Sequence, residues 1–176
     1  MKILITALFY LISLTAYAAP RIAILDFELK DLTLAPGVPA EIQRTASIQP
    51  LLKKELSSAG YEMIDIPLAA QQAANSGVGY LFDHADTAAK LGKQFGADYV
   101  LVGRLHKPSF LFAYLMGHLV KVDNQTLVAS FITESKGPNA DLVIKAVETL
   151  ADKIDAQLDN RYTPPQPQQK PLHESI

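Results

Sequence analysis

The chain has 176 residues, of which 49% are hydrophobic and 19% are charged, and its formal net charge is −2. Such a balance offers no electrostatic footprint for nucleic acid or for an anionic membrane surface, so both classes of partner are excluded. There is no cysteine, which excludes disulfides, thiol chemistry and lipid attachment through a cysteine.

The first 18 residues have the three-part pattern of a secretory signal peptide. A positive end at Lys2 is followed by an apolar stretch over residues 3–14 and by small residues at Ala16 and Ala18. We expect cleavage after about Ala18, and a mature protein located in a bacterial periplasm. Its net charge should be about −3, because Lys2 is the only charged residue that cleavage removes. The alternative is a retained anchor, but the stretch is shorter than the roughly 20 residues of a spanning helix. No membrane span is therefore expected after cleavage.

The first half of the mature chain alternates strand-like and helix-like segments. Residues 21–29 predict a strand buried on both faces, as in a parallel sheet, and residues 31–40, with two prolines and a glycine, predict a loop. Residues 42–59 predict a helix with one apolar face, made of Ile48, Leu51, Leu52, Leu56 and Ala59. Pro50 lacks the N–H that a helix interior needs, so either the helix kinks there or its second half begins there.

The middle of the chain predicts one helix between two strands. Gly60 is placed to end the preceding helix, and residues 61–67 predict a strand stopped by Pro67. Residues 68–84 are ambiguous, with a helical-looking stretch before a glycine-containing break. Asp86 can cap a helix over residues 87–95, and residues 97–107 form the most strand-like run of the chain.

The second half predicts a hairpin and a last helix. Residues 109–122 and 126–133 predict two strands joined by a turn at 123–125. Asn139 can cap a helix through about Leu158, whose apolar stripe consists of Val143, Val147, Leu150, Ile154 and Leu158. Residues 159–176 predict a Pro/Gln-rich disordered tail that serves as a linker or spacer. A single domain is therefore expected over residues 19–158.

The order β-α-β-α-β-β-β-α predicts the fold class. The first three strands should be parallel through right-handed crossovers, and the hairpin should extend the same sheet antiparallel. The expected fold is α/β, a layered sandwich of two or three layers around a mixed sheet of about five strands.

Four segments together resemble a known group of envelope domains: RIAILDFEL (21–29), LSSAGYEMIDI (56–66), AAKLGKQFGADYVLVGRL (88–105) and VKVDNQTLVAS (120–130). They are similar to the amino-terminal domain shared by TolB and the curli secretion-channel subunit, and to the outer-membrane activators of penicillin-binding proteins. Within that group the chain most resembles a family of exported proteobacterial proteins of unknown function, some of which accompany periplasmic dehydrogenases of methylotrophs. The resemblance covers about residues 21–158, and it implies a TolB amino-terminal-domain-like fold among relatives that work as docking domains.

The resemblance brings no active site with it, because none of the four motifs is catalytic and the family has no assigned catalytic residues. Two departures stand out. Leu127 occupies the position after the hairpin threonine where a glycine is usual, and no lipoprotein cysteine tethers this chain to a membrane.

Asp26 and Glu28 are the first candidates for chemistry. They lie at the carboxyl end of the first predicted parallel strand, where ligands of α/β sheets collect. A phosphoaspartate enzyme would also need a Lys and a Ser or Thr at later strand ends, and the sequence has no clear example. The alternative is structural: Asp26 accepts hydrogen bonds at the sheet margin, and Glu28 faces water. Asp26 is therefore a structural acid to test, whose mutation is expected to report on folding.

Metal and nucleophile signals are weak. The four histidines, His84, His106, His118 and His173, have no metal-ligand spacing, although His106 and His118 could meet across adjacent strands. Serines such as Ser109 and Ser130 lack a nucleophile elbow, and the glycines of residues 75–79 lack the Lys-Ser/Thr of a phosphate loop. We expect no catalytic residue, no metal site and no cofactor.

The first hairpin strand carries the candidate partner-binding surface. Strand alternation places one set of large side chains on the same face: Phe110, Phe112, Tyr114, Met116 and His118. If helices cover both faces of the sheet, this set belongs to the core. If they cover only one face, Phe110, Phe112, Tyr114 and His118 are exposed to a partner.

These observations favour a non-enzymatic periplasmic accessory or docking domain that binds another envelope or periplasmic protein, and they leave a homo-oligomer open. One alternative is a small-molecule-binding domain with a pocket near the hairpin strand. The other is an Asp26-dependent hydrolase.

Overall fold

The computed structural model describes residues 19–136, 140–159 and 161–163. The expected signal peptide at 1–18, the expected cap Asn139 and the tail from residue 164 lie outside the described residues. Across the described ranges, no helix combines the length and the apolar character that crossing a membrane requires.

Six strands and five helices follow one another in this part of the chain. The strands are β1 (Arg21–Ile24), β2 (Glu28–Asp31), β3 (Glu62–Ile64), β4 (Tyr99–Lys107), β5 (Phe112–Lys121) and β6 (Thr126–Lys136). The helices are α1 (Pro39–Ser58), α2 (Leu68–Ala74), α3 (Tyr80–Asp83), α4 (Ala85–Gln94) and α5 (Ala140–Leu158). The predicted alternation is confirmed, and the ambiguous segment 68–84 forms α2 and α3.

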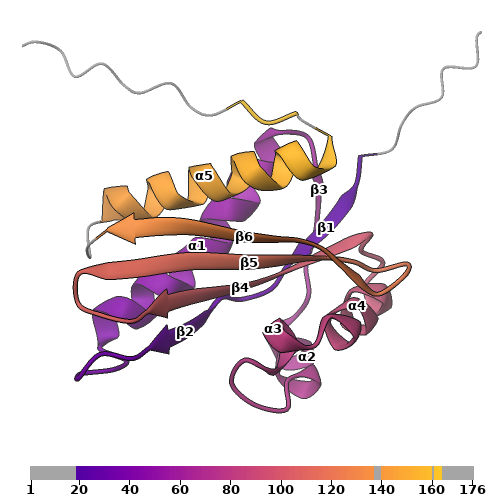
Figure 1. Ribbon diagram of the computed structural model, residues 1–176. Helices are drawn as coiled ribbons and strands as arrows, with labels where there is room; N and C mark the ends of the chain where they lie inside the picture. Colours follow the sequence, from indigo (N-terminus) through magenta and orange to yellow (C-terminus); the bar gives the residue numbers. More distant parts are fainter. Residues whose placement is uncertain (1–18, 137–139, 160, 164–176) are drawn as a thin grey trace, which may run out of the picture.

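All the strands belong to one mixed sheet (Figure 1). Its order is β3-β1-β4-β5-β6, and β2 also pairs with β4. The pairs of β1 with β3, β1 with β4 and β2 with β4 are parallel, whereas β4, β5 and β6 are antiparallel neighbours. The parallel strands are connected through helices and the antiparallel ones through tight turns, as each kind of pairing requires. The predicted mixed sheet is confirmed.

The first predicted strand is interrupted. Ile24 lies opposite Leu101, but Glu28 lies opposite Arg104, so residues 25–27 contain one residue more than the facing segment of β4. Such a bulge turns the local backbone out of the ladder. Two glutamine side chains bind the freed groups: Gln49 donates to the Ile24 carbonyl at 3.0 Å, and Gln71 accepts from the Asp26 N–H at 2.9 Å. The prediction of one unbroken strand over 21–29 was therefore wrong, because the chain leaves the ladder after Ile24 and pairs with β4 again only from Glu28.

Helices cover both faces of the sheet, with α1 and α5 on one face and α2, α3 and α4 on the other (Figure 1). The side chains of β1 and of Leu25, the residue after it, divide between two cores. Ile22 and Ile24 pack with α1 and α5, whereas Ala23 and Leu25 pack with the core beneath α4. A strand buried on both sides needs a continuous apolar run, which is what the sequence predicted. The fold is a three-layer α/β/α sandwich.

Two helix starts differ from the prediction. Helix α1 begins at Pro39 and not at Ile42, and it is continuous through Pro50, so its second half does not begin there. Pro50 and Ala46, whose carbonyl the missing N–H would have bonded, are both exposed, so water can compensate. Helix α4 begins at Ala85 with His84 at its N-cap, two residues before the expected start. Asp86 therefore lies in the first turn, where its carboxylate accepts from Lys90 at 2.9 Å.

A close contact across the sheet explains one glycine. The ring of Phe27 lies against Gly103 of β4, and a Cβ at residue 103 would overlap that ring. Phe27 follows the bulge and is buried in the core of α1 and α5. Because Gly103 has no side chain, it leaves the space that the Phe27 ring occupies.

Candidate partner-binding surface

Exposed apolar side chains gather at one end of the sheet. Seven of the twelve large apolar side chains that are exposed in the described part of the chain lie there, with 39% to 97% of their surface accessible. We call them the hairpin-end surface: Leu32, Leu34, Val38, Ile42, Phe110, Leu111 and Phe112. They come from the loop after β2, from the start of α1, and from the turn between β4 and β5 with the first residue of β5 (Figure 1). A concentration of this kind is typical of an interaction site.

Lys107, the last residue of β4, brings these three segments together. Its carbonyl accepts from the Leu32 N–H at 2.9 Å, where the first loop begins. Its Nζ lies 2.8 Å from Glu41 Oε1 in α1 and 5.7 Å from the centre of the Phe110 ring. Segments far apart in sequence therefore form one continuous end of the molecule.

Both loops of the hairpin-end surface are held by hydrogen bonds of their own. The Asp31 carboxylate accepts from the Thr33 N–H at 3.0 Å and from the Gly37 N–H at 3.2 Å. Burial opposes ionisation of Asp31, but these bonds and the charge of Lys107 outweigh it, so its pKa lies below the ordinary value. In the turn, the Ser109 Oγ accepts from the N–H groups of Leu111 and Phe112 at 3.3 Å each. The apolar side chains of these two loops are therefore carried by backbone that hydrogen bonds hold in place.

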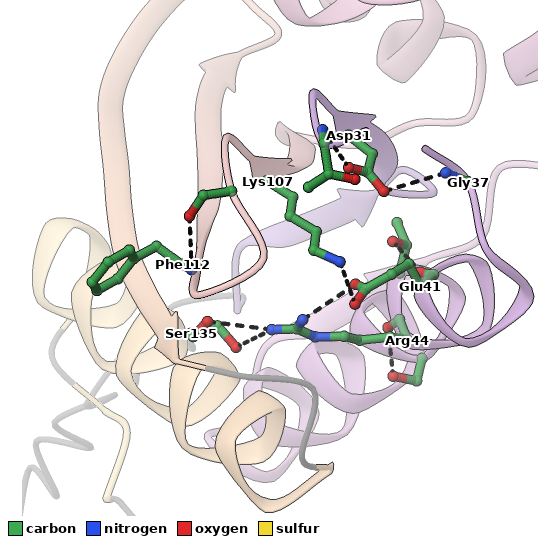
Figure 2. Close-up of polar contacts among 11 residues, drawn as sticks. Asp31, Gly37, Glu41, Arg44, Lys107, Phe112 and Ser135 are labelled. Carbon is green, nitrogen blue, oxygen red and sulfur yellow. Dashed lines mark hydrogen bonds and ion pairs between the residues drawn. The ribbon is translucent and has the colours of Figure 1, made fainter. Parts of the chain in front are cut away.

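A buried ionic cluster lies beneath this end of the sheet. Figure 2 shows Glu41 between two cations, Lys107 Nζ at 2.8 Å and Arg44 Nη1 at 3.2 Å. Arg44 Nη2 also donates to the Ser135 Oγ at 2.6 Å, and the side chains of Glu41, Arg44 and Lys107 are only 5–9% exposed. The cluster ties α1 to the ends of β4 and β6 and sets the position of the helix start.

The predicted partner-binding residues divide into two groups. Phe110 and Phe112 are exposed and belong to the hairpin-end surface, with Phe110 in the turn before β5 begins. Tyr114 is half-buried. His118 is covered, because its ring stacks on Phe82 of α3 with centroids 3.8 Å apart and its Nδ1 lies 3.0 Å from the Phe82 carbonyl oxygen. The four residues therefore do not form one exposed face, since α3 covers only the His118 end.

Asp26 and Glu28 do not act as a pair. Asp26 is exposed at the bulge, and its carboxylate has no hydrogen bond or ion pair with another described residue. Hydrogen bonds to this carboxylate were expected, but the hydrogen bond of Asp26 is the one that its main-chain N–H donates to Gln71. Glu28 does not face water, because it accepts from Arg104 Nε and from the Gly79 N–H at 2.7 Å. The bulge between them points the two carboxylates to different surroundings.

The histidines are equally separate. Across β4 and β5, His106 lies opposite Tyr114, and His118 lies opposite Val102, so the two imidazoles do not meet as suggested. Among the described residues, no group of three or more His, Cys, Asp or Glu is arranged to hold a metal ion.

The sequence contained signals for the residues that were missed. Glu41 and Arg44 precede Ile48 by seven and four residues, so they lie on the buried stripe of α1, where an unpaired charge would be costly. Leu32, Leu34 and Val38 are large apolar residues in a segment that proline and glycine make a loop. Charges on an apolar stripe and apolar residues in a loop were the available indications.

Solved structures confirm the expected fold relationship. The chain is similar to TolB from Acinetobacter baumannii, with a TM-score of 0.52 and 18% identity over 80% of this chain and 28% of TolB. It is similar to the PelC dodecamer from Paraburkholderia phytofirmans, with a TM-score of 0.50 and 15% identity over 83% of this chain and 90% of that one. The LpoB C-terminal domain from Salmonella enterica matches with a TM-score of 0.48 and 16% identity, over 68% of this chain and 84% of that domain. The first two likenesses establish the fold alone.

Among curated proteins, none matches this chain by sequence. The family model DUF3280, described as a protein of unknown function (DUF2380), matches residues 20–154. This match spans most of the chain and all the elements except the end of α5. The chain therefore belongs to this family of proteins of unknown function.

Proposed function

We propose that this protein is a non-enzymatic accessory domain of the bacterial periplasm, which docks onto another envelope or periplasmic protein through the hairpin-end surface. The observation that carries the proposal is the gathering of seven exposed apolar side chains at one end of the sheet, where both loops are held by their own hydrogen bonds. An ordered apolar surface loses little conformational entropy when a partner covers it, so more of the contact energy is available for binding.

The location rests on the expected signal peptide, and the class of function is supported by the fold. PelC, which shares the fold, is a dodecamer, so this architecture supports association between protein surfaces. The charge cluster beneath the surface adds a second reason. Glu41, Arg44 and Lys107 fix the start of α1 against the sheet, which keeps Ile42 and Val38 in place for a partner.

Capture of a partner tests the proposal. The tagged protein is crosslinked in intact cells, purified from the periplasm and compared with the double variant Phe110→Ser/Leu111→Ser. The matched control is Val78→Ser/Leu127→Ser, which removes exposed apolar side chains from other parts of the surface. We expect the wild type and the control to recover the same envelope protein, and the hairpin-end variant to recover at least tenfold less of it, with unchanged thermal unfolding. Equal recovery by all three, or no specific protein with the wild type, would contradict the proposal.

The two alternative functions have less support from the geometry. A cleft of about 500 Å³ lies between α1 and α5, where the Tyr162 hydroxyl donates to Glu55 at 3.1 Å, and none of its lining residues comes from the hairpin strand. The hydrolase hypothesis is tested by Asp26→Asn, which should abolish turnover of model phosphoesters without loss of folding if Asp26 is a nucleophile.

A further inference from the structure

Strand β2 has an open outer edge. β3 runs beside β1 only as far as Ile64, opposite Ala23, and β2 pairs with no strand except β4 in the described part of the chain. The Leu32 N–H points toward β4, because it donates to the Lys107 carbonyl. Since main-chain groups of successive strand residues point to opposite edges, those of Leu29 and Asp31 point away from β4. Such an edge is a template for a further strand.

A cleft lies along this edge, between β2 and the first half of α1. Its volume is about 360 Å³, and its walls are formed by Asp26, Phe27, Leu29, Ile42, Thr45 and Ala46. The hydroxyl of Thr45 is engaged, because it donates to the Glu41 carbonyl at 2.7 Å. The walls are otherwise apolar except at Asp26. Ile42 belongs both to the cleft and to the hairpin-end surface, so the two are continuous.

An acceptor without a donor lies on the wall of the cleft. The Asp26 carboxylate has no partner among the described residues, and it is the only charged group in the lining. The cleft therefore complements a cation at Asp26 and aliphatic side chains along its apolar walls.

We propose that this cleft takes an extended segment of the partner protein, which adds a strand to β2 and carries a Lys or Arg for Asp26. Alternate side chains of an added strand point the same way, so its apolar residues enter the cleft two positions apart. The inference rests on the proposed docking function, and it specifies the conformation and charge of the segment that docks.

Defined peptides test the inference on the chain purified from the periplasm. Two acetylated nine-residue peptides alternate valine and serine and carry one lysine, at the N-terminal end in one and at the C-terminal end in the other. Two further peptides carry glutamate in place of the lysine. We expect one lysine peptide to bind and to shift the amide resonances of Leu29 and Asp31 in an NMR titration, and the matching glutamate peptide to bind at least tenfold more weakly.

Variants of the cleft give the second readout. Ala46→Gln fills the cleft from an exposed helix position and should weaken the lysine peptide at least tenfold. Ala156→Gln, at an exposed position of α5, is the matched control and should leave binding unchanged. Asp26→Asn should remove most of the preference for lysine over glutamate while leaving thermal unfolding unchanged.

Three outcomes would overturn the inference: neither lysine peptide binds, Ala46→Gln binds as well as Ala156→Gln, or the wild type sediments as a dimer that Ala46→Gln dissociates. The last result would assign the cleft to a second copy of this chain. Partner capture separates this inference from the function on which it rests. A partner that is retained by Ala46→Gln but lost by Phe110→Ser/Leu111→Ser contradicts only the strand addition, whereas no partner with the wild type contradicts the docking function itself.

Discussion

Glu41 is the residue on which the end of the sheet depends. Its two carboxylate oxygens meet two buried cations, one from its own helix and one from β4. A buried ion pair contributes little net stability over apolar residues of similar size, because desolvation offsets the attraction between the charges. Its effect is on geometry, since Lys107 and Arg44 both contact the Glu41 carboxylate. Loss of that anion leaves both cations in a site with little access to water.

Glu41→Gln should therefore destabilise the protein strongly. We expect the free energy of unfolding to fall by about 3–5 kcal/mol, the usual cost of removing one partner from a buried charge pair. Asp86→Asn breaks the exposed pair with Lys90 and should leave stability nearly unchanged. Urea unfolding of the three proteins measures both effects. Equal midpoints for Glu41→Gln and Asp86→Asn would show that the cluster is not desolvated.

At the scale of elements, the bulge and the loop after β2 determine which residues near β1 and β2 are exposed. The bulge exposes Asp26 and returns Phe27 to the core against Gly103. The loop over residues 32–38 then depends on Asp31, whose carboxylate accepts two of the loop's N–H groups. Ionised Asp31 is therefore part of the loop structure.

The stability of this loop should depend on pH in the acid range. The pKa of Asp31 is lowered in the folded chain, so the unfolded chain binds more protons between that value and the ordinary aspartate value of about 3.9. Its contribution is present above pH of about 4 and is lost as the pH falls through the folded value. Urea midpoints between pH 6 and pH 2.5 should fall less steeply for Asp31→Asn than for the wild type. Asp98 is a second source of acid sensitivity, because its hydrogen bond with Arg21 lowers its pKa, so the slope should not vanish. A slope that is unchanged in Asp31→Asn would contradict the assignment.

At the scale of the whole molecule, two separate cores hold the sheet between its helical layers. The larger core joins β1, β4 and β5 to α1 and α5, and Leu150 of α5 is fully buried within it. The second core lies beneath α4. Because α1 supports the hairpin-end surface and the β2 cleft, the first core positions both proposed contact regions.

Leu150→Ala tests the contribution of the first core. We expect a loss of about 2–5 kcal/mol in the free energy of unfolding, as for other buried leucines that leave a cavity. Ile144→Ala on the same helix is the matched control, since Ile144 is 40% exposed and its truncation should cost less than about 1 kcal/mol. Chemical unfolding provides the comparison, and similar losses for the two variants would mean that α5 is not packed as described.

The prediction of secondary structure succeeded where the side chains on one face of a helix or strand are uniformly apolar. Val143, Val147, Leu150 and Ile154 of α5 are buried as their spacing predicts, and the turn at 123–125 joins β5 to β6. It failed at Asp86, which was given more weight than its context, and of the two alternatives at Pro50 the structure excludes a new helix start. Helix α4 begins at Ala85, directly after His84, and α1 continues through Pro50, where both Pro50 and Ala46 are exposed residues.

The sequence by itself determined the alternation of strands and helices, the apolar stripes and the double burial of β1, because periodicity and composition are local and each residue contributes to them independently. Only the tertiary structure decided the bulge, since it arises from the register of β1 and β2 against β4 and from glutamines on two different helices. Only the tertiary structure paired Glu41 with Lys107 and Arg44 with Ser135, which are 66 and 91 residues apart. Contacts at such separations depend on how layers stack, and no local pattern records them. For the same reason the exposed end of the hairpin and the cleft beside β2 became visible only once the strands were in place.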